Sequence, residues 1–207
     1  MLVFSATSPI VIDAQTGSIG IFGIAFSPAI GVGLMVYAFA KISGAHFNPA
    51  VSNGFLINRS INAREFLLYC ISQIGGAVLG SVAVLHAIGS DAYLGVNFPG
   101  DVGSMEAFLV EIFLTFLLMS VILAVAHTRG MKGFGGVAIG LIVGLDILFG
   151  GEISGASMNP ARSLAPALLS SNFMYLWIYL SAPFVGSALS AISYKILERR
   201  IIISKRE

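Results

Sequence analysis

Charged residues are scarce in this 207-residue sequence, because Asp, Glu, Lys and Arg together make up only 10%. A soluble domain usually has roughly a quarter of its residues charged. Hydrophobic residues reach 57%, and 24 positions are glycine. This composition excludes an ordinary soluble domain and predicts a membrane protein of closely packed helices, with the lipid bilayer as its surroundings. The net charge of +1 indicates no nucleic-acid partner.

Cysteine is nearly absent, since Cys70 is the only one. A single thiol in an apolar run excludes a disulfide framework and a thiolate metal site. The sequence also has no His/Cys/carboxylate cluster and no Ser/His/Asp grouping, so no metal, cofactor or catalytic residue is expected and the chain is not read as an enzyme. No basic flank precedes the first apolar run, which argues against a cleavable signal.

Five apolar runs are long enough to cross a hydrocarbon core of about 30 Å. They cover residues 18–42, 65–88, 105–127, 134–153 and 174–197. Residues 1–12 resemble a sixth span, but a helix of that length would be only about 18 Å long. Either the first span is truncated or the chain starts inside that helix. The prediction is an all-α membrane protein with six spans.

Basic residues gather on one side of these spans. With both ends placed in the cytoplasm, nine of the eleven basic residues fall inside: Arg59, Arg64, Arg129, Lys132, Lys195, Arg199, Arg200, Lys205 and Arg206. The outer loops carry Asp13, Asp91, Asp101 and Glu152 instead. This asymmetry predicts a multi-pass protein of the cell membrane whose C-terminus is cytoplasmic.

One eight-residue phrase occurs twice, as SGAHFNPA at 43–50 and SGASMNPA at 154–161, with six of eight positions identical. The same offset of 111 residues pairs 32–34 with 143–145, both Val-Gly-Leu. Three spans in each half make the two repeats inverted in the membrane. The chain is therefore read as one channel domain, 1–207, with repeat one at about 1–88, repeat two at about 104–197 and a basic tail at 198–207.

Each phrase ends in a helix-start signal, with Asn48 or Asn159 as the N-cap and a proline in the first helical position. The apolar stretches that follow, 51–57 and 163–169, are too short to span, so each phrase should open a re-entrant half-helix of about ten residues. The irregular backbone before each asparagine must then line a cavity. The predicted pore centre is Asn48, Pro49, Ala50, Asn159, Pro160 and Ala161, and the predicted pore-lining backbone is Gly44, Ala45, His46, Phe47, Gly155, Ser157 and Met158.

The two Asn-Pro-Ala boxes, Arg162 directly after the second box, six spans and Glu111 early in the fourth span together resemble the aquaporin and glycerol-facilitator family, the major intrinsic proteins. The resemblance covers nearly the whole chain. It implies that Asn48 and Asn159 meet at the centre of a pore, that Glu111 hydrogen-bonds the re-entrant backbone, and that the protein is a homotetramer with one pore per subunit.

The same resemblance identifies Arg162 as the arginine of an outer selectivity filter; a salt bridge to Glu152 is the alternative. Spacing from Asn159 carries two further filter positions onto Ile147 and Ala156. Strict water channels of the family usually have histidine where Ile147 stands, so a more apolar and wider ring is expected. The fourth position, usually aromatic, falls on Pro28, with Phe26 as an alternative source of the ring.

The function predicted from these features is a passive channel for water that excludes ions and protons. Passage of glycerol or other small neutral solutes is left open, including a facilitator for such solutes as the main role. An ion-coupled transporter would also use inverted repeats and broken helices. It would need a titratable group at the midplane, for which Asp146 is the one candidate.

Overall fold

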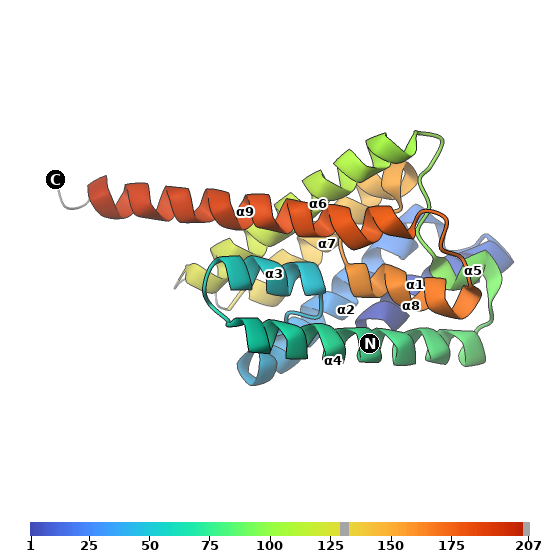
Figure 1. Cartoon of the computed structure of the whole chain (residues 1–207). Helices are drawn as coiled ribbons and strands as arrows, with labels where there is room; N and C mark the ends of the chain where they lie inside the picture. The colour runs from blue at the N-terminus through green and yellow to red at the C-terminus, as the bar shows by residue number, and fades with distance from the viewer. Residues whose placement is uncertain (129–132, 205–207) are drawn as a thin grey trace.

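The computed structural model describes residues 1–128 and 133–204, and within these ranges the chain is helical, with no β-strand (Figure 1). The elements in chain order are α1 Leu2–Thr16, α2 Gly20–Ser43, α3 Pro49–Ile57, α4 Ala63–Ala87, α5 Asp91–Gly95, α6 Ser104–His127, α7 Gly135–Ser154, α8 Pro160–Ser170 and α9 Leu176–Ser204. Four of the basic residues in the charge argument, Arg129, Lys132, Lys205 and Arg206, lie outside the described residues.

Five helices, α2, α4, α6, α7 and α9, are long and apolar enough to cross a membrane. They correspond to the five apolar runs, with α2 starting at Gly20 against a predicted 18 and α7 at Gly135 against a predicted 134. Helix α1 has 15 residues, about 22 Å at 1.5 Å per residue. The five predicted long helices are confirmed, and α1 is shorter than each of them.

Helices α2 and α7, one from each half of the chain, pack at very short range because small residues face each other. A Cβ atom built on Gly140 would lie 2.5 Å from the carbonyl oxygen of Ala29. On Gly136 it would lie 2.6 Å from the carbonyl oxygen of Gly33. Neither glycine can be replaced without separating the helices, which is the packing expected where small residues let helix backbones approach.

The short helices α3 and α8 lie roughly end to end between the long helices α4 and α9 (Figure 1). Both begin at a proline that follows an extended asparagine N-cap. The predicted half-helices are thus confirmed, with nine residues in α3 and eleven in α8. Their N-termini face each other, and the two repeated phrases lie between them.

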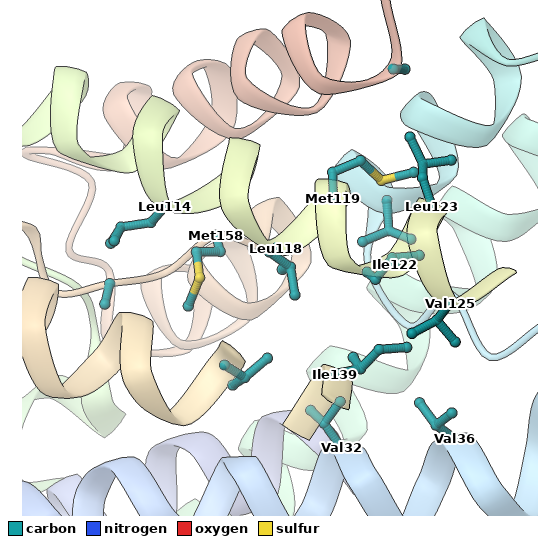
Figure 2. Close-up of a cluster of buried hydrophobic side chains, with 14 residues drawn as sticks. Val32, Val36, Leu114, Leu118, Met119, Ile122, Leu123, Val125, Ile139 and Met158 are labelled. Atoms are coloured by element: carbon teal, nitrogen blue, oxygen red, sulfur yellow. The ribbon is translucent and has the colours of Figure 1, made fainter. Parts of the chain in front are cut away.

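A cluster of buried apolar side chains holds the second phrase against the long helices. Met158 is 3% exposed and lies among side chains of α6, next to Leu114 and Leu118 (Figure 2). The cluster continues through Ile139 and Val143 of α7 to Val32 of α2. It forms a rigid wall on one side of the repeated phrases.

Candidate functional site

Asn48 and Asn159 cap their own helices and also bind each other's loops. The Oδ1 of Asn48 accepts from the Ala50 N–H at 2.8 Å, and the Oδ1 of Asn159 accepts from the Ala161 N–H at 3.1 Å. The Nδ2 of Asn48 donates to the Met158 carbonyl at 2.7 Å, and that of Asn159 donates to the Phe47 carbonyl at 3.1 Å. Each amide nitrogen carries two N–H groups, so one per asparagine is left for the space between them.

The backbone of the two phrases is folded in the same irregular way. Gly44 and Gly155 have φ of 68° and 81°, Ala45 and Ala156 have 52° and 42°, and Phe47 and Met158 have 50° and 52°. These positions correspond under the 111-residue offset. Non-glycine residues adopt this left-handed conformation at a cost of about 1–2 kcal/mol each, so both loops need support from the surrounding helices.

Glu111 of α6 supplies that support to the second loop. Its carboxylate accepts from the Ser157 N–H at 2.7 Å, from the Met158 N–H at 2.8 Å and from the Ser154 hydroxyl at 3.0 Å. A tyrosine also supports the first residue of each phrase: Tyr69 donates to the Ser43 carbonyl and Tyr179 to the Ser154 carbonyl, both at 2.7 Å.

Three cavities follow one another past the repeated phrases. A central one of about 90 Å³ is lined by Asn48 and Asn159. It shares Leu2, His46 and Phe47 with a cavity of about 510 Å³ at one end. It shares Ala6, Ile147, Ala156 and Arg162 with a cavity of about 270 Å³ at the other end. Because neighbouring cavities share lining residues, they lie next to one another, and this series of three cavities is called the path.

The central cavity has one apolar wall and one polar wall. Its apolar wall comes from the long helices, with Val32, Val36, Leu118, Ile122, Ile139 and Val143. Its polar wall comes from the two phrases. Six of the seven residues predicted as pore-lining backbone line this cavity: Gly44, Ala45, His46, Phe47, Ser157 and Met158. The seventh, Gly155, lines the outer cavity. Such a path orients a solute along a single row of hydrogen-bonding groups.

His46 is held in place by both packing and hydrogen bonding. Its ring lies between the rings of Phe55 and Tyr69, with centroids 4.4 Å away on each side. Its Nδ1 lies 3.1 Å from the Ser52 hydroxyl, to which Gln73 donates at 3.0 Å. These contacts fix the imidazole where the central cavity meets the larger one.

Arg162 lies at the passage where the central and outer cavities meet. The Nη1 of Arg162 donates to the Gly95 carbonyl and to the Oδ1 of Asn97, both at 2.6 Å, and its Nη2 donates to the Ala6 carbonyl at 3.4 Å. A guanidinium has five N–H donors, so two of them are not used by these bonds. All three acceptors are neutral, so none of these hydrogen bonds neutralises the positive charge of Arg162.

Asn97 is a site residue that the sequence did not reveal. Besides binding Arg162, its Oδ1 accepts from the Ser163 hydroxyl at 2.7 Å and its Nδ2 donates to the Gly155 carbonyl at 2.7 Å. It follows α5, a single turn in which Ala92, Tyr93 and Leu94 are all left-handed. This turn carries the Gly95 carbonyl and the Asn97 amide to the guanidinium.

We expect Asn97→Ala to lower water and glycerol flux by about three- to tenfold, because losing one hydrogen bond to a charged group lets the guanidinium leave the wall and enter the passage. The measurement is osmotic shrinkage of proteoliposomes. Asn53→Ala is the control, since Asn53 makes two hydrogen bonds away from Arg162, to the Phe184 carbonyl and the Ser187 hydroxyl. A variant that loses thermal stability with unchanged flux would show that Asn97 has only a structural role.

Two sequence-based alternatives are wrong. Phe26 is 66% exposed and lines neither the central nor the outer cavity, whereas Pro28 lines the central one. The salt bridge between Arg162 and Glu152 does not form either, because Glu152 is exposed and Arg162 bonds to neutral oxygens. Ala6, Ile147, Ala156 and Arg162 line both cavities, and Pro28 lines the central one. These five residues are called the outer ring.

Asp146 does not line the path. Its side chain is 3% exposed, and its Oδ2 has no hydrogen-bond partner in the described part of the chain. Neither the central nor the outer cavity includes it among its lining residues. The carboxyl group of Asp146 is thus enclosed behind the cavity wall. It does not supply the titratable group on the path that an ion-coupled transporter would need.

Comparison with known proteins gives matches over nearly the whole chain. Residues 1–194 match the family model described as major intrinsic protein. The chain is 42% identical over 205 residues to "Glycerol uptake facilitator protein-like 6" of Lactiplantibacillus plantarum, covering 95% of this chain and 93% of that one. It is 37% identical over 198 residues to "Aquaporin NIP1-4" of rice, Oryza sativa subsp. japonica, covering 95% and 72%. Among solved structures, the aquaglyceroporin from Plasmodium falciparum superposes with a TM-score of 0.83 at 26% identity, over 93% of this chain and 89% of that one.

Proposed function

Because the chain belongs to the major intrinsic protein family, whose members are membrane channels for water and small solutes such as glycerol, we propose that its pore conducts both water and glycerol-sized neutral solutes passively. It is a multi-pass integral membrane protein of that family. Members of the family are channels and not enzymes. The proposal concerns the solute, which is decided at the outer ring.

The composition of that ring carries the proposal. Pro28, Ile147 and Ala156 are apolar, and Arg162 is its single charged side chain. An apolar wall accommodates the carbon backbone of a polyol, while the unused donors of Arg162 bind its oxygens, the usual division of roles in a small-molecule site. A histidine in place of Ile147 would add a polar group and take up that apolar surface.

Ion exclusion is proposed to come from two fixed sources of positive potential. The N-termini of α3 and α8 face each other at the two asparagines, and a helix N-terminus carries about half a positive charge. Arg162 adds a full charge at the outer ring. A cation would meet both, and a file of water would be oriented by the amide donors of Asn48 and Asn159, which disfavours proton transfer along it.

The names of two similar proteins agree with this solute class. The relative from Lactiplantibacillus plantarum is named a glycerol uptake facilitator-like protein, and the solved structure from Plasmodium falciparum is titled an aquaglyceroporin. We propose the same solute class for this chain, with water as the second permeant.

We further propose a cytoplasmic C-terminus and a homotetramer with one pore in each subunit. The orientation follows from the basic residues, such as Arg59, Arg64 and Lys195, on one side of the spans. The homotetramer is proposed from membership of the family. Large apolar side chains such as Phe22 of α2 and Phe149 of α7, each 72% exposed, are available to lipid or to a neighbouring subunit.

Stopped-flow light scattering on proteoliposomes tests the solute assignment. Fast osmotic shrinkage, followed by re-swelling when glycerol enters down its gradient, is the expected result. Water flux without glycerol flux would reject the glycerol half of the proposal. Flux at the background of empty vesicles would reject the channel for this chain.

We expect Ile147→His to reduce glycerol permeability roughly tenfold while water permeability changes much less, since small changes in an apolar pocket discriminate solutes by about 10- to 200-fold. The imidazole narrows the ring and replaces apolar surface that the carbon backbone contacts. Ile147→Leu is the control, because it keeps the apolar character and nearly the same volume. Equal losses of water and glycerol flux in the histidine variant would contradict this role of Ile147.

A further inference from the structure

We propose that Pro28 gives the outer ring a backbone acceptor, the carbonyl oxygen of Ile24, and that this oxygen binds a hydroxyl group of a passing polyol opposite Arg162. The inference rests on the proposed function, because it assigns a partner for the solute in the same passage. It makes Pro28 a residue that determines specificity through the backbone.

Proline removes a hydrogen bond from the interior of a helix. Pro28 lies inside α2, and its nitrogen has no hydrogen to donate to the carbonyl four residues earlier, which is that of Ile24. The proline ring also crowds this carbonyl and tilts it away from the helix axis. The Ile24 oxygen therefore lacks the N–H donor that the corresponding carbonyl of a regular helix has.

The position of this carbonyl follows from the cavities on either side of it. Residues four apart lie on the same face of a helix, one above the other. Ile24 lines the outer cavity and Pro28 lines the central cavity, and both cavities are lined by Arg162. The Ile24 oxygen, which points from the first residue toward the second, thus lies at the level where the two cavities meet.

Four other carbonyls near this passage already accept a hydrogen bond from a side chain. Gly155 accepts from Asn97, Ser154 from Tyr179, and Gly95 and Ala6 from Arg162. In the described part of the chain no side chain donates to the Ile24 carbonyl, and the neighbouring Ser27 hydroxyl donates to Ser5 instead. The contrast with Pro9 of α1 is direct, because the carbonyl that Pro9 frees, that of Ser5, accepts from the Ser27 hydroxyl at 2.8 Å.

A hydroxyl group is the chemical partner that fits this pair of groups. It can accept from an N–H of Arg162 and at the same time donate to the Ile24 carbonyl. A solute with adjacent hydroxyls on a short carbon backbone satisfies both groups while its carbons face Ile147. The ring thus offers a donor on one side and an acceptor on the other, with an apolar surface between them.

Two substitutions separate the acceptor from the size of the proline ring. Pro28→Ala and Pro28→Val both restore an N–H that occupies the Ile24 carbonyl, but alanine is smaller than proline and valine is larger. We expect both variants to lower the ratio of glycerol to water permeability about three- to tenfold, the effect of losing one hydrogen bond. The assay is stopped-flow light scattering on proteoliposomes, normalised to the amount of folded protein. Pro9→Ala is the control, since it restores an N–H to a carbonyl that already has a partner, and its ratio should stay at the wild-type value.

The outcomes that would overturn the inference are distinct from those that test the proposed function. If the two Pro28 variants shift the ratio in opposite directions, ring volume decides the effect and the acceptor has no role. A ratio equal to that of wild type in both variants rejects the acceptor while the glycerol channel stands. A wild-type pore that passes water but no glycerol rejects the proposed solute and the acceptor together.

Discussion

Replacing Glu111 with alanine is expected to lower the free energy of unfolding by about 3–9 kcal/mol, because three buried donors lose their acceptor at about 1–3 kcal/mol each. The carboxylate is fully buried and binds the Ser157 and Met158 amides and the Ser154 hydroxyl. Water flux should fall toward the background of empty vesicles, since the second loop loses the group that fixes its backbone.

The size of this effect reflects the strain that Glu111 offsets. Ala156 and Met158 are left-handed, and each such residue costs about 1–2 kcal/mol. The three hydrogen bonds to one side chain keep these residues in place and thereby keep the Met158 carbonyl where the Nδ2 of Asn48 reaches it. Without the carboxylate the loop can relax into conformations in which the two asparagines no longer meet.

Chemical denaturation in detergent, followed by circular dichroism, measures the loss of stability. Glu111→Gln should lie between wild type and Glu111→Ala, because the amide retains one acceptor oxygen but offers its NH2 group to an N–H donor. Glu106→Ala is the matched control, since Glu106 lies in the first turn of the same helix and is exposed. A loss below about 1 kcal/mol in Glu111→Ala, the contribution of a single hydrogen bond, would contradict the support role.

The half-helices could be predicted from the sequence because their signals are local. An asparagine followed by proline fixes an N-cap and a first helical residue within two positions, and the repeat supplied the same signal twice. The apolar runs also fixed the long helices, since their length and composition suffice. The structure bears out both: Asn48 and Asn159 are extended N-caps, and each accepts from the backbone two residues later.

The wall around Arg162 could not be predicted in full, because it is assembled from distant segments. Asn97 comes from a loop of ordinary composition, 65 residues before Arg162, and Ala6 comes from the first helix, 156 residues before it. Neither has a local signal. The prediction that Phe26 supplies an aromatic ring does not hold for a geometric reason. Two residues along a helix correspond to a rotation of about 200°, which places the Phe26 ring on the face opposite Pro28.

Replacing Arg162 with valine is expected to increase cation leak through the pore by roughly a hundred- to a thousandfold. A unit charge about 4 Å from a passing ion contributes about 4 kcal/mol at an effective dielectric constant of 20, which corresponds to nearly three decades in rate. The side chain is buried at the passage and hydrogen-bonded only to neutral oxygens. None of its hydrogen-bond partners cancels this field, although the buried Glu111 carboxylate offsets part of it through space.

The measurement is the collapse of a sodium gradient and of a proton gradient in proteoliposomes, each followed by a trapped fluorescent indicator. Arg162→Lys is the control that separates charge from shape. It should keep cations out, because the ammonium retains the charge, but it should change the glycerol-to-water ratio, because lysine lacks the planar fork that binds two acceptors and a solute at once.

Sodium and proton leak are expected to respond differently in Arg162→Val, and this difference separates the two barriers in the path. Sodium must shed its water shell at the ring, so it should gain most from the loss of the charge. A proton would still have to cross the file of water oriented by Asn48 and Asn159, whose amide donors remain fixed by the Met158 and Phe47 carbonyls. If both leaks rose equally, the central asparagines would contribute little to proton exclusion; if neither rose, the facing N-termini of α3 and α8 would be a sufficient barrier without Arg162.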